Sequence, residues 1–339
     1  MAKPTIRDVA AEAKVSIATV SYVVNGTKPV SEERRARVER AIKALGYRPN
    51  ALAQGLKLGI SGTVAVVLSD IANTRYTLFL RGLYHKLNES GVTAFVADAE
   101  GIYEKERQHI ESLTSRQVNA IVLASSRAKV GELIDAVGAE VPIVLLDSEI
   151  EDGVVFTVQP DYRSAVIRAT RHLVSVGKRD IVFVGPQDET RSGKESLKGY
   201  VLALRSVGSY DQESVLYGDS SEEGGRDVTL EMLDRRQEAP EAVVAADPYM
   251  GLGVLHALYE RGLAVPGDVA VVTVGWRPAF PKLWLPQPTT LEVPWHEAGV
   301  VVGQCVVDLV ENARVGESAV TPSGQVIALD VPLVPGETA

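Results

Sequence analysis

From Gly62 onward, short apolar runs alternate with helix-length amphipathic stretches, and this rhythm leaves few folds open to the chain. The runs "TVAVVLSD", "VTAFVAD", "AIVLAS" and "PIVLLD" are typical of buried strands. The alternation starts again after "VVFTVQPDY", with "DIVFVG", "AVVAAD" and "VAVVTVG". Strands that are apolar on both faces belong to parallel sheets covered by helices. The sequence therefore predicts an α/β body of two doubly wound subdomains, in which ligands bind outside the carboxyl ends of the strands.

Short helices are predicted ahead of this body. The first starts at Thr5 and Asp8, which have the spacing of a capping box. Ser16 can cap a second helix almost immediately after the first, and Ser31 can cap a third, "EERRARVERAIKALG". Two tightly joined helices followed by a third predict an all-α helix-turn-helix head.

The stretch "VSIATVSYVVNG", which contains the second helix, has an alternative as a hairpin strand closed by Asn-Gly. A helix would place on one face the apolar residues Ile17, Val20, Val23 and Val24. A strand would mix Thr19 and Ser21 with Ile17 and Val23, which leaves no clean polar face. The pattern therefore favours the helix.

The charge of the chain is divided unevenly. Residues 1–58 hold 11 Lys and Arg against 5 Asp and Glu, a net charge of +6, whereas the whole chain carries −9. A basic head on an acidic body is the asymmetry expected when one small domain meets phosphate. We therefore expect the head to bind nucleic acid.

The chain also resembles the LacI/GalR-type bacterial transcription regulators over essentially its full length. The motifs "DVA", "VS..TVS", "VSEE" and "LGYRPN" fall at the spacing of that family. The resemblance implies a homodimeric, sequence-specific repressor of a palindromic double-stranded DNA operator. It also implies a periplasmic-binding-protein-like body that holds a small-molecule effector, sugar-like or other, between two lobes joined by three chain crossings.

In helix-turn-helix docking the second helix enters the major groove. Ile17 and Ala18 would offer only apolar contacts to base edges, whereas neighbouring hydroxyl and amide groups suit phosphate oxygens. The family usually has Arg where this chain has Tyr22, so we expect an unusual half-site. The predicted DNA-binding residues are Thr5, Ser16, Ile17, Ala18, Thr19, Ser21, Tyr22, Asn25, Asn50 and Leu56.

The predicted hinge is weakly structured by itself. Pro49 extends the chain before it, Asn50 can cap, and "ALAQGLKLG" is too short for a stable isolated helix. The resemblance implies that this segment folds on the operator, where Leu56 would wedge between base pairs in the minor groove. The predicted domains are the head 1–47, the hinge 48–60 and the body 61–339, with lobe one at about 61–159 and 291–319 and lobe two at about 160–290 and 320–339.

Strand ends and family positions give the candidate effector site. Its predicted residues are Ser69, Arg75, Tyr76, Ser125, Asp147, Arg191, Ser196, Asp247 and Trp276. Relative to the family, Ser196 replaces an Arg, Ala246 an Asn, and Trp276 stands near a usual carboxylate. Buried sugar hydroxyls need paired donors and acceptors, so these losses make a plain hexose less favoured. Trp276 could stack on a sugar, bind a more apolar effector, or fill the cleft.

The sequence gives no support for an enzyme, a metal or a cofactor. "GPQDETRSGKES" contains Gly-Lys, but Asp188 and Glu195 stand where a phosphate-binding loop needs Gly and Ser or Thr. Cys305 is the single cysteine, and the histidines are scattered. No apolar run suits a signal peptide or a membrane span, so a cytoplasmic location is expected.

Two alternatives stay open at this point. The first is a regulator of the same family whose degenerate cleft binds no effector, or which answers to a partner. The second is a solute-binding protein, which the basic head and the missing signal peptide oppose. The chain ends soon after "VIALDVPLVPGETA", without a helical tail, and we therefore expect a dimer rather than a higher assembly.

Overall fold

The computed structural model describes residues 4–25, 28–47, 62–116, 118–124, 130–137, 141–149, 156–187, 190–275, 286–314 and 324–339. Contacts divide the chain into two compact units, Met1–Ser61 and Gly62–Ala339, which we call the head and the body. Four predicted site residues, Asn50, Leu56, Ser125 and Trp276, lie outside the described residues. None of the described helices combines the length and apolar character that a membrane span requires.

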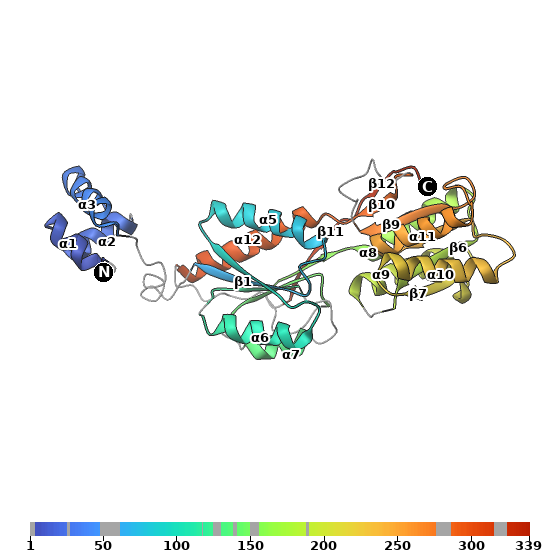
Figure 1. The fold of residues 1–339 in the computed structure, drawn as a ribbon, viewed down its shortest axis with the longest axis horizontal. Helices are drawn as coiled ribbons and strands as arrows, with labels where there is room; N and C mark the ends of the chain where they lie inside the picture. The colour runs from blue at the N-terminus through green and yellow to red at the C-terminus, as the bar shows by residue number, and fades with distance from the viewer. Residues whose placement is uncertain are drawn as a thin grey trace. The chain divides into compact units, whose positions relative to one another are not determined.

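The head contains α1 (Ile6–Ala13), α2 (Ile17–Asn25) and α3 (Glu32–Leu45), as Figure 1 shows. The predicted helix in "VSIATVSYVVNG" is thus confirmed. Asp8 caps α1, because its Oδ2 accepts hydrogen bonds from the Thr5 amide at 2.7 Å and the Thr5 hydroxyl at 2.8 Å. The three helices enclose a small core of Val9, Ala10, Ala13, Val20, Val38 and Ala41.

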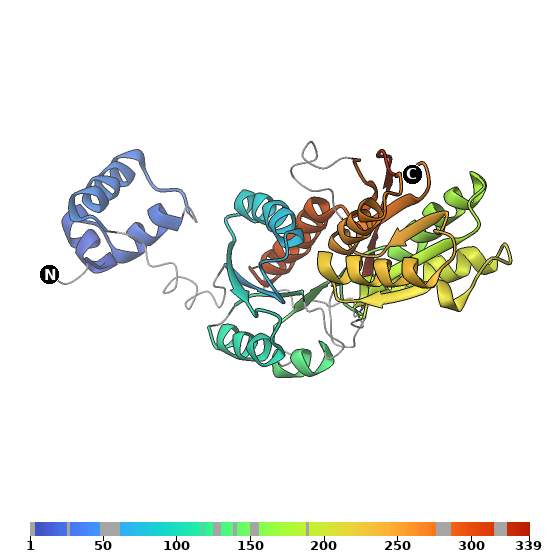
Figure 2. The same ribbon diagram turned by 45° about the vertical axis from the view of Figure 1, so that its right-hand side comes forward.

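The first sheet of the body has the order β11-β5-β4-β3-β1-β2, and all its described strands are parallel. Its strands are β1 (Thr63–Leu68), β2 (Thr93–Asp98), β3 (Ile121–Ala124), β4 (Ile143–Leu146), β5 (Phe156–Pro160) and β11 (Gln325–Leu329). Its helices are α5 (Arg75–Glu89), α6 (Tyr103–Thr114), α7 (Val130–Val137) and α12 (Trp295–Arg314). α5 and α12 lie on one face and α6 and α7 on the other (Figures 1 and 2). We call this part lobe one.

The second sheet has the order β12-β10-β9-β8-β6-β7, and of these described strands only β12 is antiparallel to its neighbour. Its strands are β6 (Ile181–Pro186), β7 (Val215–Gly218), β8 (Ala242–Ala245), β9 (Ala270–Gly275), β10 (Thr289–Glu292) and β12 (Leu333–Val334). α8 (Tyr162–Ser175) packs with α9 (Arg191–Arg205), and α10 (Glu222–Arg235) with α11 (Pro248–Glu260); a short 3₁₀ helix spans Gln212–Ser214. This part is lobe two, and the predicted pair of doubly wound subdomains is confirmed.

The chain passes between the lobes from β5 to α8, from β10 to α12 and from β11 to β12. The prediction that residues 320–339 belong together to lobe two needs correction. β11 pairs in parallel with β5 of the first sheet, so Gln325–Leu329 belong to lobe one. The last crossing therefore falls between Leu329 and Leu333.

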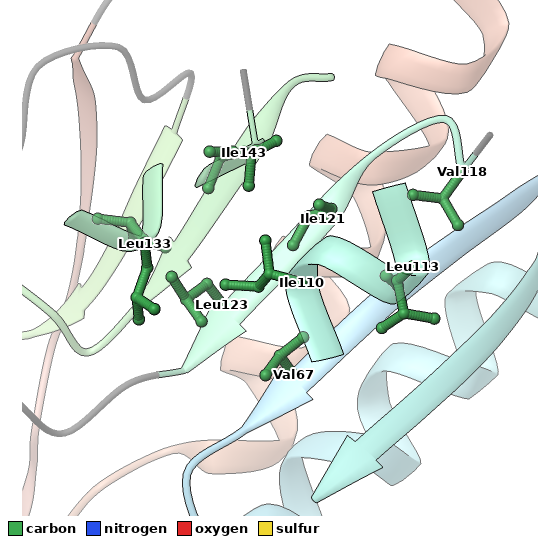
Figure 3. Packing of buried hydrophobic residues seen from close by; sticks show 11 residues of the cluster. Val67, Ile110, Leu113, Val118, Ile121, Leu123, Leu133 and Ile143 are labelled. Carbon is green, nitrogen blue, oxygen red and sulfur yellow. The ribbon is translucent and has the colours of Figure 1, made fainter. Parts of the chain in front are cut away.

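Each lobe has its own apolar core. In lobe one, Val67, Ile121, Leu123 and Ile143 from the sheet meet Ile110 of α6 and Leu133 of α7 (Figure 3). On the opposite face, α5 and α12 approach closely at two glycines. A Cβ atom on Gly82 would lie 2.0 Å from the His296 carbonyl oxygen, and one on Gly299 would lie 2.0 Å from the Phe79 carbonyl oxygen. Close packing of these two helices fixes the start of α5, which carries Arg75.

Candidate DNA-binding face and interlobe cleft

The start of α2 presents its side chains to solvent. Ser16, Ile17 and Ala18 are exposed, and Ile17 exposes 47% of its surface, while Val20 on the opposite side of the helix is fully buried. Ile17 is not part of the apolar core of the head, so its side chain is available for contact with a partner. The Ser16 hydroxyl accepts a hydrogen bond from the Thr19 amide at 3.1 Å and lies 2.9 Å from the Thr19 hydroxyl. These two hydroxyls therefore order the first turn of α2.

One feature of this face was not predicted. Lys28 Nζ lies 5.2 Å from the centre of the Tyr22 ring, so a cation stands beside the residue that replaces the family's usual Arg. Lys28 stands three residues after the end of α2 in the sequence, and that proximity was the available signal. The Thr5 hydroxyl donates to Asp8, so its proton is not available to a phosphate in this arrangement. Ser21 and Tyr22 are half-buried, and α2 ends at Asn25.

In the body, Asp147 stands at the centre of a buried cluster that joins the lobes. Its carboxylate accepts hydrogen bonds from Arg191 Nη1 at 3.1 Å and from the Tyr162 hydroxyl at 2.9 Å, both from lobe two. Arg75 of lobe one lies 3.9 Å away. Asp147 has a φ of 51°, a left-handed conformation that Asp tolerates better than most residues. We call Arg75, Asp147, Tyr162 and Arg191 the arginine–aspartate cluster.

Arg191 is anchored further by lobe one. Its Nη1 also donates to the Pro160 carbonyl at 3.1 Å, and its Nη2 donates to Gln159 Oε1 at 3.1 Å. Lys194, one turn along α9, lies 3.5 Å from Glu149 of lobe one. The first turn of α9 is therefore anchored both to β5 and to the segment that follows β4.

Arg75 is held by aromatic rings and, within the described part of the chain, by only one hydrogen bond to a side chain. Its guanidinium lies 4.8 Å from the Tyr76 ring centre and 5.5 Å from the Trp295 ring centre. Its Nη2 donates to the Tyr76 hydroxyl at 3.0 Å, and that hydroxyl donates to the Ala124 carbonyl at 3.2 Å. Ser69 lies 2.9 Å from the same hydroxyl. Tyr76 is thus a buried support for Arg75, and Ser69 supports Tyr76.

A cavity of about 40 Å³ lies between the lobes. Its lining includes Asn73, Arg75 and Trp295 of lobe one and Tyr162, Ser192, Asp247 and Tyr249 of lobe two. Asp247 caps α11, since its Oδ1 accepts hydrogen bonds from the Tyr249 and Met250 amides at 2.8 and 3.1 Å. Gly275 and Pro248 also line the cavity, and they pack so closely that a Cβ atom on Gly275 would lie 2.7 Å from Pro248 Cδ.

Burial and the neighbouring donors shift the pKa values of Asp147 and Asp247 in opposite directions. Burial raises the pKa of Asp147, and the Arg75 and Arg191 guanidinium groups oppose that shift. Burial also raises the pKa of Asp247, opposed by the amides of Met250 and Tyr249. Each carboxylate therefore depends on its donors to stay ionised.

Of the predicted effector residues that the structure describes, only Arg75 and Asp247 line this cavity, with Tyr76, Ser69, Asp147 and Arg191 arranged behind them. Ser196 is fully buried and is absent from the lining. It lies in α9, which packs so closely on α8 that a Cβ on Gly199 would be 2.5 Å from the Arg163 carbonyl oxygen. Sequence reasoning missed Tyr162, Ser192 and Trp295. Each is the first or second residue of a helix that follows a strand, and that position was the only signal.

The comparisons with known proteins agree with this architecture. Residues 5–50 match the model described as bacterial regulatory proteins, lacI family, and residues 170–329 match a periplasmic binding protein-like domain. The chain is 30% identical over 318 residues to the catabolite control protein A of Priestia megaterium, covering 93% of this chain and 95% of that protein. It is 30% identical to the HTH-type transcriptional regulator RegA of Clostridium saccharobutylicum, with 92% and 94% covered.

Solved structures give the same result. A lac repressor dimer bound to operator and the anti-inducer ONPF is 26% identical, covers 99% of both chains and has a TM-score of 0.85. A complex of the transcriptional regulator CelR with cellobiose is 31% identical, covers 99% of this chain and 100% of that one, and has a TM-score of 0.70. The chain belongs to the lacI family of bacterial regulatory proteins. It is a DNA-binding transcriptional regulator and not an enzyme, as the sequence predicted.

Proposed function

We propose that the protein is a homodimeric repressor whose two heads bind the halves of a palindromic operator. The exposed start of α2 carries this proposal, because Ser16, Ile17 and Ala18 are displayed on a head segment with a net charge of +6. One such head reads only a half-site, and two related by a twofold axis read a palindrome. The operator-bound lac repressor dimer supports the same assembly. A regulator of bacterial DNA acts in the cytoplasm, where we place this protein.

The DNA claim is tested by selecting binding sites from random duplexes with the full chain. A palindromic consensus should emerge, and affinity for it should fall steeply with salt as phosphate contacts release counterions. Ile17→Gln should change the selected bases near the centre of each half-site while leaving binding to unrelated DNA unchanged. Selection of no consensus, or an affinity indifferent to salt, would reject operator binding.

The hinge supplies a separate test. If Leu56 wedges into the minor groove, Leu56→Ala should weaken specific binding far more than non-specific binding. Leu52→Ala, in the same hinge, removes the same side chain at another position and is the matched control. Equal losses on both kinds of DNA for Leu56→Ala would reject the wedge.

We propose further that a small molecule bound between the lobes controls the operator affinity. Support comes from the polar residues that both lobes contribute to one cavity, and from the cellobiose complex of CelR. A ligand that binds the folded protein raises its unfolding temperature, and by linkage must change operator affinity if it acts as an effector. A ligand that stabilises the protein but leaves operator affinity unchanged would contradict this control.

A second candidate is a regulator of the same family that uses no effector. It is favoured by the cavity volume of about 40 Å³, far below the roughly 300 Å³ or more of usual ligand pockets. It is favoured also by the arginine–aspartate cluster, in which the lobes satisfy each other. Under this candidate no sugar, nucleoside or phosphorylated metabolite should shift the unfolding temperature.

A further inference from the structure

We propose that Arg75 anchors a phosphate or carboxylate group of the effector, so that the cleft selects anionic small molecules. This inference rests on the proposed control by an effector. It names the chemical class of ligand and the residue that distinguishes that class from neutral molecules.

The first argument is the incomplete pairing of Arg75. Its nearest carboxylate, Asp147, is 3.9 Å away, which is an ion pair without a hydrogen bond. Asp147 accepts its hydrogen bonds from Arg191 and Tyr162 instead. Arg75 Nε is buried and has no hydrogen-bond partner among the described residues. A buried guanidinium donor without an acceptor is costly, and an anion would satisfy it.

The second argument is the charge around the cavity. Arg75 and Arg191 share the single carboxylate of Asp147, which leaves one guanidinium in excess within the cluster. Asp247 adds a second negative charge beside this cavity, but its carboxylate accepts hydrogen bonds from two main-chain amides at the start of α11 rather than from Arg75. Lys194 and Glu149 pair with each other at the rim. Arg75 is therefore the guanidinium of the cluster that has no hydrogen bond to a carboxylate among the described residues.

The third argument is that Arg75 is fixed in place and still reaches the cavity. The Tyr76 and Trp295 rings flank its guanidinium, and 20% of the side chain stays accessible. Asn73 from lobe one and Ser192 from lobe two line the same cavity and offer neutral donors. A rigid cation with neutral donors on either side is the arrangement expected of a site for a phosphate or carboxylate.

The ligand must enter while the lobes are apart. A cavity of about 40 Å³ is far below the roughly 300 Å³ or more of usual ligand pockets, so it is too small for a metabolite. Opening separates Arg191 of lobe two from Asp147 of lobe one, and the anion of the ligand then binds Arg75 and the guanidinium of Arg191. Anion binding and lobe movement are therefore coupled.

The test measures unfolding temperature of the full chain in increasing sodium phosphate, against sodium chloride of equal ionic strength. Phosphate should stabilise the wild type more than chloride does. Arg75→Gln should weaken apparent phosphate affinity about tenfold or more, as expected for loss of a charge-assisted hydrogen bond. Arg81→Gln, an exposed arginine on the same helix, should behave as wild type. Arg75→Lys keeps the charge and should retain part of the effect.

Matched pairs then identify the anion. Ribose 5-phosphate is compared with ribose, and succinate with succinamide, on wild type and Arg75→Gln. Only charged members should bind, and only to proteins with a cation at position 75. Equal stabilisation by phosphate and chloride, or neutral members binding as well as charged ones, would overturn the inference. Operator binding is measured on the same samples, so failure of the anion site with intact operator binding leaves the proposed DNA function standing.

Discussion

Asp147→Asn should destabilise the body far more than an ordinary loss of surface charge. Asn keeps the shape of the side chain and tolerates the left-handed backbone at this position, where φ is 51°. The change therefore removes charge without adding strain. It leaves Arg75 and Arg191, which expose only 20% and 15% of their side chains, without their shared carboxylate.

The size of the effect follows from the burial of that carboxylate. Asp147 exposes 9% of its side chain, and breaking a buried pair by removing one partner costs about 3–5 kcal/mol. Asn can still accept one hydrogen bond from Arg191, so we expect a loss of about 3 kcal/mol. Asp330→Asn is the matched control. Asp330 pairs with Arg168 at 2.8 Å but exposes 75% of its side chain, so its loss should be less than about 1 kcal/mol.

Urea unfolding followed by tryptophan fluorescence measures this difference in the body alone. All three tryptophans, Trp276, Trp284 and Trp295, follow Gly62 in the sequence, so the head contributes no tryptophan signal. The midpoint should fall while the denaturant slope stays constant, as expected when stability changes without a change in the surface exposed on unfolding. Equal midpoints for the two variants would refute the assigned role of Asp147.

Three further predictions address other parts of the chain. Gly299→Ala should destabilise the body by about 1–3 kcal/mol or more in the same urea assay, because its methyl group would meet the Phe79 carbonyl at 2.0 Å. Lys28→Ala should reduce the salt slope of operator binding by about 1 if Lys28 contacts a phosphate. The Thr5 amide and hydroxyl hold the pKa of Asp8 below its ordinary value of 3.8. The stability from this carboxylate is therefore present above pH 3.8 and lost as the pH falls through the lower folded value, and Thr5→Ala should raise the Asp8 pKa in an NMR titration.

Strands with long apolar runs were predictable, and strands without them were not. The seven runs quoted from the sequence correspond to β1, β2, β3, β4, β6, β8 and β9. β11, with the sequence "QVIAL", lies at a sheet edge and leaves Gln325 and Val326 exposed, so it has no continuous apolar pattern. β12 has only 2 residues. A strand as exposed as β11 or as short as β12 buries few apolar residues, which removes the signal that periodicity detects.

The position of the cleft was predictable from the sequence, whereas only some of the residues that form it were. Arg75, Asp147 and Asp247 follow strands, and parallel sheets bring the carboxyl ends of those strands together. The sequence could not predict that Tyr162 and Trp295 would join them, because their contacts depend on how one lobe packs against the other. Ser196 was predicted from a family position alone, and it lies fully buried in α9, away from the lining of this cavity.

Asp147 stabilises the arginine–aspartate cluster but should weaken binding of an anion to the same arginines. A variant at this position therefore tests both roles together. In the wild type Asp147 competes with any ligand anion for Arg75 and Arg191, and the cost of separating them lowers the apparent ligand affinity. Asp147→Asn removes that competitor. The variant should therefore be less stable than wild type without phosphate and should gain more stability from phosphate, whereas Asp330→Asn should gain no more than wild type. If the cluster serves only to hold the lobes together, phosphate will stabilise all three proteins equally.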